Sequence, residues 1–369
     1  MNKWVVYISF LLISCSSTNR IAKMPADIPY YVWTRGFHNP SPEEIRNLFV
    51  DLQGKGINGI IYSAGDQRQK YVNAAEIAEE LGLEFYVLIP ALIQYKHTKL
   101  KKELYVVNGL GDSAYDQPAY PRNHFVCPNR PEIYQYLEKM YEAVLDLPGV
   151  DGIQLDVIRF PDVILAKALW EKYDVVMDRE YPQYDYCYCD KCVGDFKAQT
   201  GINIKEVPDP GKIKEWKHFR YDLLTKLVNH LAEMVHSKGK KINAAVFPGP
   251  HSVAMKIVRQ EWHKWNLDAF FPMNYNDFYL EDTDWIGDVC KEAVHAVKDK
   301  KPIYSGLFIC PDPENRDQLK DPEYFGLLPG ELEAAIHASV RNGASGICLF
   351  TAGRMTDAHW EVFKQVLRQ

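Results

Sequence analysis

The sequence predicts an α/β fold in which eight parallel strands alternate with eight helices and close into a (β/α)8 TIM barrel. Strand-like and helix-like segments alternate along most of the 369 residues, which is typical of a parallel sheet covered by helices. No glycine-rich phosphate loop follows the first expected strand, so a closed barrel is favoured over an open doubly wound sheet. Long insertions follow the third and fourth expected strands, at the end of a barrel where loops are commonly elaborated.

The expected elements follow from short apolar runs and from helical spacing. Strands are expected at 30–34, 57–63, 83–90, 150–158, 241–247, 268–275, 302–309 and 346–350. Helices are expected after Ser41 to about residue 52, then at 72–81, 132–146, 216–237, 253–265, 285–297, 331–341 and from 357 onward. The insertions cover about 91–131 and 160–214, and the barrel domain as a whole covers 29–369.

Two helices carry clear end signals. Ser41 is an N-cap residue, Pro42 suits the first turn, and Glu44 completes a capping box. The helix over 331–341 ends at Asn342-Gly343, a typical C-cap. Helical boundaries are therefore predicted at both ends of the domain.

The first 15 residues resemble a bacterial lipoprotein signal peptide. Lys3 precedes an apolar run of ten residues, Trp4 to Ile13, which is shorter than the roughly 20 residues that a membrane-spanning helix needs. Leu12-Ile13-Ser14-Cys15 is similar to a lipobox, which predicts cleavage before Cys15, lipidation of Cys15 and a tether over 16–28. We expect an exported lipoprotein anchored in the outer or inner membrane by lipid alone, facing the periplasm or the cell surface. The alternative is an ordinary signal peptide with an incidental cysteine.

The charge and the aromatic content limit the expected partners. The formal net charge is −6 and there is no basic tract, so we expect no nucleic-acid partner. The chain has 23 Tyr, 16 Phe and 8 Trp. Flat rings with polar edges suit sugar faces, although many of these rings are expected in the core.

The fourth expected strand carries the most informative motif, Asp151-Gly152-Ile153-Gln154-Leu155-Asp156-Val157-Ile158-Arg159-Phe160-Pro161. Asp156 falls near the carboxyl end of this apolar strand, where the catalytic residues of a barrel lie. A charge there must face the barrel mouth or incur a large desolvation cost. Arg159 could keep a carboxylate ionised or bind an anionic substrate group. The alternative is an Asp–Arg pair that ties loops together.

This motif resembles the D-G-I-H-x-D-Y-I-R-Y-P signature of the family-10-like glycosyl hydrolase group of barrels. Cys127-Pro128-Asn129-Arg130-Pro131-Glu132 is similar to that group's N-P-E-V stretch, and Phe271-Pro272-Met273-Asn274-Tyr275 to its P-M-x-Y. In the related α-galactosidase-like barrels a strand-four aspartate is the nucleophile and a strand-six carboxylate is the acid/base. The resemblance therefore implies that Asp156 is the nucleophile and Asp277 the acid/base.

Other residues near the expected strand ends are candidates for the same site. Asp162, Asp112 and Asp312 are loop acids that could replace Asp277 as the second carboxylate. The expected substrate-binding residues are Arg159, Trp33, Arg35, His38, Tyr62, Asn274 and Tyr275. Each of them could instead be structural.

Family 18 chitinases offer a competing comparison through their D-G-x-D-x-D-x-E motif. This chain has Gln154 at the middle aspartate and Ile158 at the acid/base glutamate. Met273-Asn274-Tyr275-Asn276 keeps part of that family's M-x-Y-D. Without the proton donor, the N-acetyl-assisted mechanism of that family is not expected here.

A cysteine cluster lies in the second insertion, at Cys187, Cys189 and Cys192. Three thiolates this close suit a tetrahedral zinc site, and Cys127 in the first insertion is the expected fourth ligand. The segment resembles one in family 42 β-galactosidases, which implies a structural zinc that pins two loops. The alternative is disulfides, but seven cysteines after Cys15 cannot all pair. Cys290, Cys310 and Cys348 are expected in the core, and no organic cofactor is expected.

These observations together predict a glycoside hydrolase that acts on oligo- or polysaccharides. The main alternative is a non-catalytic carbohydrate-binding barrel lipoprotein that has lost one carboxylate. A lyase or deacetylase is a third alternative.

Overall fold

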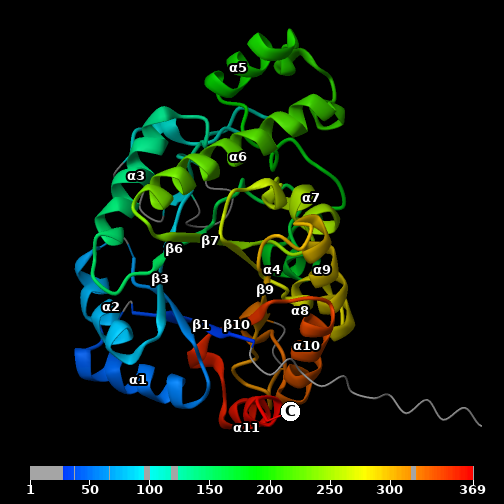
Figure 1. The fold of residues 1–369 in the computed structure, drawn as a ribbon. Coiled ribbons are helices and arrows are strands. Elements are labelled where there is room, and N and C mark those ends of the chain that lie inside the picture. Colours follow the sequence, from blue (N-terminus) through cyan, green and yellow to red (C-terminus); the bar gives the residue numbers. More distant parts are fainter. Residues whose placement is uncertain are drawn as a thin grey trace, which may run out of the picture.

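A computed structural model describes residues 28–36, 38–65, 67–94, 100–117, 124–316 and 321–368. These residues form a parallel barrel surrounded by helices (Figure 1). The expected signal peptide, the lipidation site Cys15 and nearly all of the expected tether lie outside the described residues. Within the described part of the chain, no helix is sufficiently long and apolar to cross a membrane.

The barrel confirms the predicted fold class and all eight predicted strands. In chain order the strands are β1 Tyr30–Arg35, β2 Gly59–Ser63, β3 Glu84–Pro90, β6 Gly152–Asp156, β7 Lys241–Val246, β8 Ala269–Pro272, β9 Tyr304–Phe308 and β10 Gly346–Phe350. They pair in parallel in the order β8-β7-β6-β3-β2-β1-β10-β9. Parallel bridges between Phe270 and Ile303 and between Met273 and Gly306 bring β8 against β9 and close the barrel.

The outer layer consists of helices that follow the strands. They are α1 Pro42–Gly54, α2 Gln69–Leu81, α3 Pro131–Leu145, α6 Lys214–Ser237, α7 Met255–Val258, α9 Thr283–Ala296, α10 Pro329–Arg341 and α11 Asp357–Val366. The predicted capping box of Ser41 and Glu44 is present at the start of α1. The local signals therefore place this helix correctly.

The expected continuous helix over 253–265 is wrong. A five-residue π-helical turn, Pro250–Ala254, precedes the short α7, and a 3-10 turn, Trp262–Lys264, follows it. Arg259 interrupts the segment with φ +60°. Its guanidinium reaches Glu180 at 2.8 Å and Asp185 at 3.1 Å, so the chain leaves the helix at the residue that makes these long-range ion pairs.

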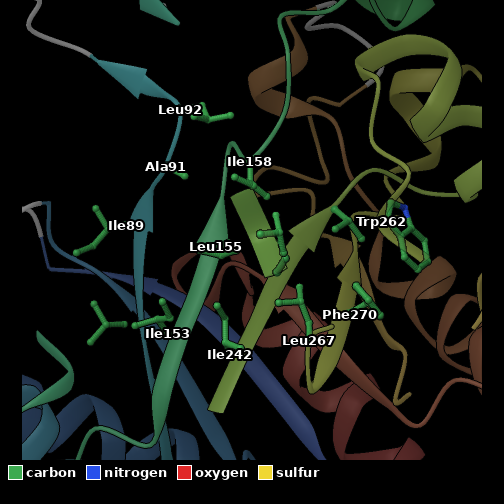
Figure 2. Close-up of a cluster of buried hydrophobic side chains, with 14 of the residues drawn as sticks. Ile89, Ala91, Leu92, Ile153, Leu155, Ile158, Ile242, Trp262, Leu267 and Phe270 are labelled. Atoms are coloured by element: carbon green, nitrogen blue, oxygen red, sulfur yellow. The ribbon is translucent and has the colours of Figure 1, made fainter. Parts of the chain in front are cut away.

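Two apolar layers hold the barrel together. Side chains alternate along each strand, so Ile153 and Leu155 of β6 point outward to the helix layer (Figure 2). The intervening Gln154 points inward and is fully buried. The inner layer includes Tyr31, Trp33 and Phe271. The same alternation turns Asp156 toward the inside of the barrel at its carboxyl end.

The insertions lie at this carboxyl end of the barrel. The first contains β4 Ile93–Gln94, which pairs antiparallel with β5 His124–Phe125. The second contains α4 Trp170–Tyr173 and α5 Asp190–Thr200. Helix α5 lies beyond α6 at one edge of the molecule (Figure 1). Both insertions contribute residues to the site described next.

Candidate active site

Asp156 is the last residue of β6, and its carboxylate is half-buried at the barrel mouth. Burial raises the pKa of Asp156, while the backbone N–H of Val157 and the charges of Arg159 and Arg35 act to lower it. The Val157 N–H donates to Asp156 Oδ1 at 2.8 Å. Val157 adopts φ +46°, which is unusual for a β-branched residue. Backbone strain of this kind often occurs at functional sites.

Two cavities meet at Asp156. The larger has a volume of about 920 Å³ and the smaller about 330 Å³. Asp156, Met273 and Tyr275 line both of them. Asp156 is therefore accessible from two sides.

The larger cavity rests on an aromatic cluster and a buried polar chain. Tyr275 packs on Phe308 and Phe350, with ring centroids 4.9 and 5.8 Å apart. Below it, Trp33 Nε1 donates to Gln154 Oε1 at 2.5 Å, and Gln154 Nε2 donates to Asn243 Oδ1 at 2.8 Å. Trp33 lines this cavity but is only 4% exposed. The indole N–H of Trp33 already donates to Gln154. The part of the ring that lines the cavity can therefore make only apolar contacts with a substrate.

The smaller cavity is mostly apolar and is walled partly by the second insertion. Its lining includes Leu165, Ala166, Leu169 and Tyr173 of that insertion, with Phe247, Phe278 and Tyr279 from the barrel loops. Arg159 and Asp162 supply its charges and pair with each other at 2.7 Å. Among the described residues, Asp162 is the one carboxylate besides Asp156 that lines either cavity.

Arg159 holds residues of this cavity wall together through several contacts. Besides Asp162, its Nη1 donates to the carbonyl of Phe160 at 3.0 Å. Its guanidinium lies over the rings of Phe125 and Phe247, at 5.3 and 5.0 Å. The cation therefore has a carboxylate partner and two ring partners before any substrate arrives.

Three expected substrate-binding residues lie away from both cavities. Tyr62 is 2% exposed and packs between Phe49 and Phe85 on the outer face of the sheet. The alternation along β2 turns its side chain toward the helices and away from both cavities. The side chain of Asn274, just after β8, also faces outward, where its Nδ2 donates to Ser305 Oγ at 2.9 Å. His38 lies in an exposed turn after β1 and lines neither cavity.

The structure does not bring Asp277 together with Asp156. Asp277 Oδ1 accepts from Arg316 Nη2 at 2.8 Å, and Oδ2 accepts from the Gly326 N–H at 2.6 Å. Asp277 lines neither cavity, and the same is true of the other two loop acids, Asp112 and Asp312. Of the four candidate second carboxylates, Asp162 is the one that lines a cavity together with Asp156.

Several polar residues of the larger cavity were not expected from the sequence. Ser63 and Thr351 lie at or just after the ends of β2 and β10, and Gln94 and Tyr136 come from the first insertion and α3. The first two could have been found by taking the final residues of every strand. Gln94 and Tyr136 carry no local signal, because only the tertiary fold brings their segments over the barrel.

The four predicted cysteines converge between the insertions. Their sulfur atoms all lie within 4.8 Å of one another and all four residues are buried. Cys127 Sγ lies 3.7 Å from Cys189 Sγ and 3.5 Å from Cys192 Sγ. All seven described cysteines are free, so the disulfide alternative is wrong. Hydrogen bonds from the neighbouring thiols lower the pKa of Cys189, which favours the thiolate form that binds metal.

Comparison with known proteins adds the fold but no close relative. No family model matches the chain, and no curated protein matches it. Among solved structures, α-L-fucosidase isoenzyme 2 from Paenibacillus thiaminolyticus aligns with TM-score 0.59 and 13% identity over 93% of this chain. The catalytic domain of β-amylase from Paenibacillus polymyxa aligns with TM-score 0.58 and 11% identity, covering 93% of this chain and 98% of that domain. The chain therefore shares the TIM-barrel fold of these two enzymes.

A third similar structure is a class V chitinase from Pseudomonas fluorescens, with TM-score 0.53 and 10% identity, covering 92% of this chain and 100% of the chitinase. The chain covers 49% of the fucosidase. At these identities the likeness to glycoside hydrolase barrels concerns the fold, and the chemistry must be argued from the residues of the site.

Proposed function

We propose that this protein is a glycoside hydrolase acting on oligo- or polysaccharide, with Asp156 as its principal catalytic carboxylate. The observation that carries the proposal is the position of Asp156 at the carboxyl end of β6, on the shared wall of two cavities. Catalytic groups of barrel enzymes lie at this end. Burial raises the pKa of Asp156, which makes it easier for this carboxyl group to hold and donate a proton.

Glycosidic cleavage normally uses two carboxyl groups in different environments. We propose Asp162 as the second group in preference to Asp277, because Asp162 lines the smaller cavity with Asp156. Asp156 has no carboxylate or cationic partner at hydrogen-bond distance among the described residues, whereas Asp162 is paired with Arg159. The two acids therefore differ in environment, as the two roles require.

A non-catalytic carbohydrate-binding barrel is the second candidate. One observation favours it: both candidate partners of Asp156 are already engaged, Asp162 with Arg159 and Asp277 with Arg316. A second carboxylate held in an ion pair is a weak base and a poor proton donor. This candidate predicts sugar binding without hydrolysis.

A glycan screen with the purified full chain tests the proposal. Reducing-end release from a polysaccharide panel should occur with the unaltered protein and fall by about 100-fold or more in Asp156→Asn. Asp222→Asn, which changes an exposed acid on α6, is the matched control and should keep full activity. Hydrolysis that survives Asp156→Asn would refute the catalytic role, and binding without hydrolysis would favour the second candidate.

The pH profile of hydrolysis then assigns the role of Asp156. If it donates the proton, activity is lost as pH rises through its raised pKa. If it is the nucleophile, as the α-galactosidase-like resemblance implies, activity is lost as pH falls through that pKa. The limb that disappears or shifts in Asp156→Glu identifies the group responsible.

We also propose that the cysteine cluster holds a structural zinc ion. Cys127, Cys187, Cys189 and Cys192 offer the four thiolate ligands of a closed tetrahedral site. Such an ion would tie the two insertions together beside the barrel mouth, and no step of catalysis would pass through it. The lipid anchor at Cys15 and the periplasmic or surface location are proposals that rest on the N-terminal sequence.

A further inference from the structure

Arg35 is a cation at the barrel mouth that forms no ion pair with any described residue, although its charge acts on Asp156 across the cavity. It ends β1, its side chain is exposed, and it lines the larger cavity together with Asp156. Its guanidinium lies 5.5 Å from the centroid of the Phe350 ring. Among the described residues its side chain makes no hydrogen bond or ion pair. A guanidinium has five N–H donors in a planar fork, so all of them remain for a ligand.

Arg159, the other arginine expected to bind the substrate, does not have its charge free for a ligand. Its charge is already balanced by Asp162 at 2.7 Å. The larger cavity has a single acid among its described lining residues, and that acid is Asp156. Arg35 is therefore the group in this cavity that is suited to an anion.

A second arginine adds positive charge next to Arg35. The guanidinium of Arg354 lies 4.3 Å from the centroid of Phe308, a ring that packs against both Tyr275 and Phe350. Its N–H groups donate to three backbone carbonyls, of Ile309 at 2.6 Å and of Glu323 and Phe325 at 2.8 Å each. Carbonyls satisfy its donors but do not neutralise its charge, and it makes no ion pair within the described part of the chain.

The two arginines thus lie on one aromatic cluster, and Arg35 also lines the cavity of Asp156. Burial lowers the pKa of Arg354, and the neighbouring charge of Arg35 acts in the same direction. Arg354 is half-buried and Arg35 is exposed at the cavity, and two neighbouring like charges repel each other unless an anion lies between them. The whole chain is acidic, with a net charge of −6, so this local excess of positive charge is opposite in sign to the protein as a whole.

We infer that the larger cavity binds a sugar unit carrying a negative charge, a carboxylate or a sulfate, and that Arg35 is the residue that recognises it. The inference rests on the proposed function, because it names the substrate class of the same site. Arg35 would supply the direct bidentate contact. Arg354, with its donors occupied, would supply charge only. Tyr275 and Phe350 would offer ring faces to the sugar.

Binding of matched glycans to the full chain tests this inference. The probes are oligosaccharides from polygalacturonate, alginate, glucuronoxylan and carrageenan, each compared with its carboxyl-reduced or desulfated twin. Calorimetry with Asp156→Asn avoids turnover during the measurement. At least one charged member should bind about tenfold or more tightly than its neutral twin, since a charge-assisted hydrogen bond contributes about that factor. The uronate and sulfate pairs distinguish the two sources of charge.

Arg35→Gln, introduced in the same background, should remove that preference and leave the affinity for the neutral twin unchanged. Arg46→Gln is the matched control, because Arg46 pairs with Glu80 on the outer surface of the barrel. The preference should also weaken as salt is raised, which is a second readout if Arg35→Gln fails to fold. Equal binding of every pair, binding of neither member, or a preference that persists in folded Arg35→Gln would overturn the inference.

This outcome is separable from that of the proposed function. Charge-selective binding without hydrolysis by the unaltered protein would leave the inference standing and remove the enzymatic role. Hydrolysis of neutral glycans that depends on Asp156, with no preference for charged ones, would do the reverse.

Discussion

Arg159 Nη1 donates to Asp162 Oδ2 at 2.7 Å in the wall of the smaller cavity, three residues along the same loop. From the sequence, Arg159 is expected to act on a carboxylate such as Asp156 or on the substrate. The structure instead pairs it with Asp162 and stacks it on Phe125 and Phe247. The pair shapes the site by keeping a charged loop packed against the barrel mouth.

Replacing Asp162 by Asn should therefore affect both folding and function. It leaves the Arg159 charge with no carboxylate partner in a mostly buried position, which typically costs about 3 kcal/mol of unfolding free energy. Urea unfolding followed by circular dichroism measures this cost. If Asp162 is also the second catalytic acid, hydrolysis should fall by about 100-fold under conditions where the variant stays folded. A variant as stable as the unaltered protein would show that the ion pair contributes little.

Asp156→Asn should make the protein more stable at neutral pH while it abolishes hydrolysis. Burial raises the pKa of Asp156 in the folded state, so the ionised carboxylate is less favourable there than in the unfolded chain. The fold thus loses stability as pH rises from the unfolded pKa to the raised folded pKa. Asparagine keeps the acceptor for the Val157 N–H without the charge. Thermal melts at pH 7 should give a higher midpoint for the variant, and the difference should vanish below about pH 4. A lower midpoint at pH 7 would contradict this account.

Loss of Asp185 should destabilise the second insertion. Asp185 Oδ1 accepts from Arg220 and from Arg259 Nη2, the latter at 3.1 Å, and Tyr188 donates to Oδ2 at 2.7 Å. Asp185→Asn leaves two buried guanidinium groups short of a carboxylate, which should cost about 3–5 kcal/mol. Asp209→Asn, at an exposed pair with Lys212, is the control and should cost less than about 1 kcal/mol.

The pH dependence of this stabilisation has a definite sign. Burial opposes ionisation of Asp185, but Arg220 and Arg259 more than offset it, so the pKa of Asp185 is lowered in the folded state. Its contribution is fully present above the unfolded pKa of about 3.9 and is lost as pH falls through the lower folded pKa. Urea titrations of both proteins from pH 7 to pH 2 should converge at the acid end. A gap that stays constant over this range would refute the electrostatic explanation.

Zinc should be present at one ion per chain and should depend on the cysteine cluster. Cys189→Ser removes one thiolate, so bound zinc by elemental analysis should fall well below one per chain. Hydrogen exchange should then increase over the insertions near Cys127 and Cys192, while the barrel helices keep their circular dichroism. Cys290→Ala is the control, because Cys290 is a buried core residue far from the cluster in sequence that donates to the Ser339 carbonyl. Equal zinc in Cys189→Ser and the unaltered protein would reject the site.

Lipid anchoring predicts that Cys15→Ser stays unprocessed or becomes soluble. The unaltered protein, expressed with its own N-terminus, should partition into detergent. The substituted protein should partition into the aqueous phase or retain its first residues on mass spectrometry. Identical partitioning of the two proteins would exclude an anchor at Cys15.

Asp156 and Tyr62 each lie near the carboxyl end of a strand, but their side chains point to opposite faces of the sheet. Asp156 was placed correctly at the carboxyl end of a strand because its position depends on local apolar patterning. Tyr62 was placed at the mouth by the same reasoning, yet its side chain faces the helices. Successive side chains of a strand point to opposite faces, so an error of one residue exchanges the inside of the barrel for the helix layer. In a parallel strand that is apolar on both faces, the sequence does not show which face lies inside.

By itself the sequence determined the order of strands and helices, the capped ends of α1 and α10, the position of Asp156 and the four cysteines that could converge. These features depend on neighbouring residues, on periodicity or on short spacings. Tertiary structure decided which acids and cations are paired: Arg159 with Asp162, Asp277 with Arg316, and Arg35 with no described partner. Pairing depends on how the fold bends each loop and on which distant segments it brings together, because the energy of a charge depends on what lies within a few ångströms of it.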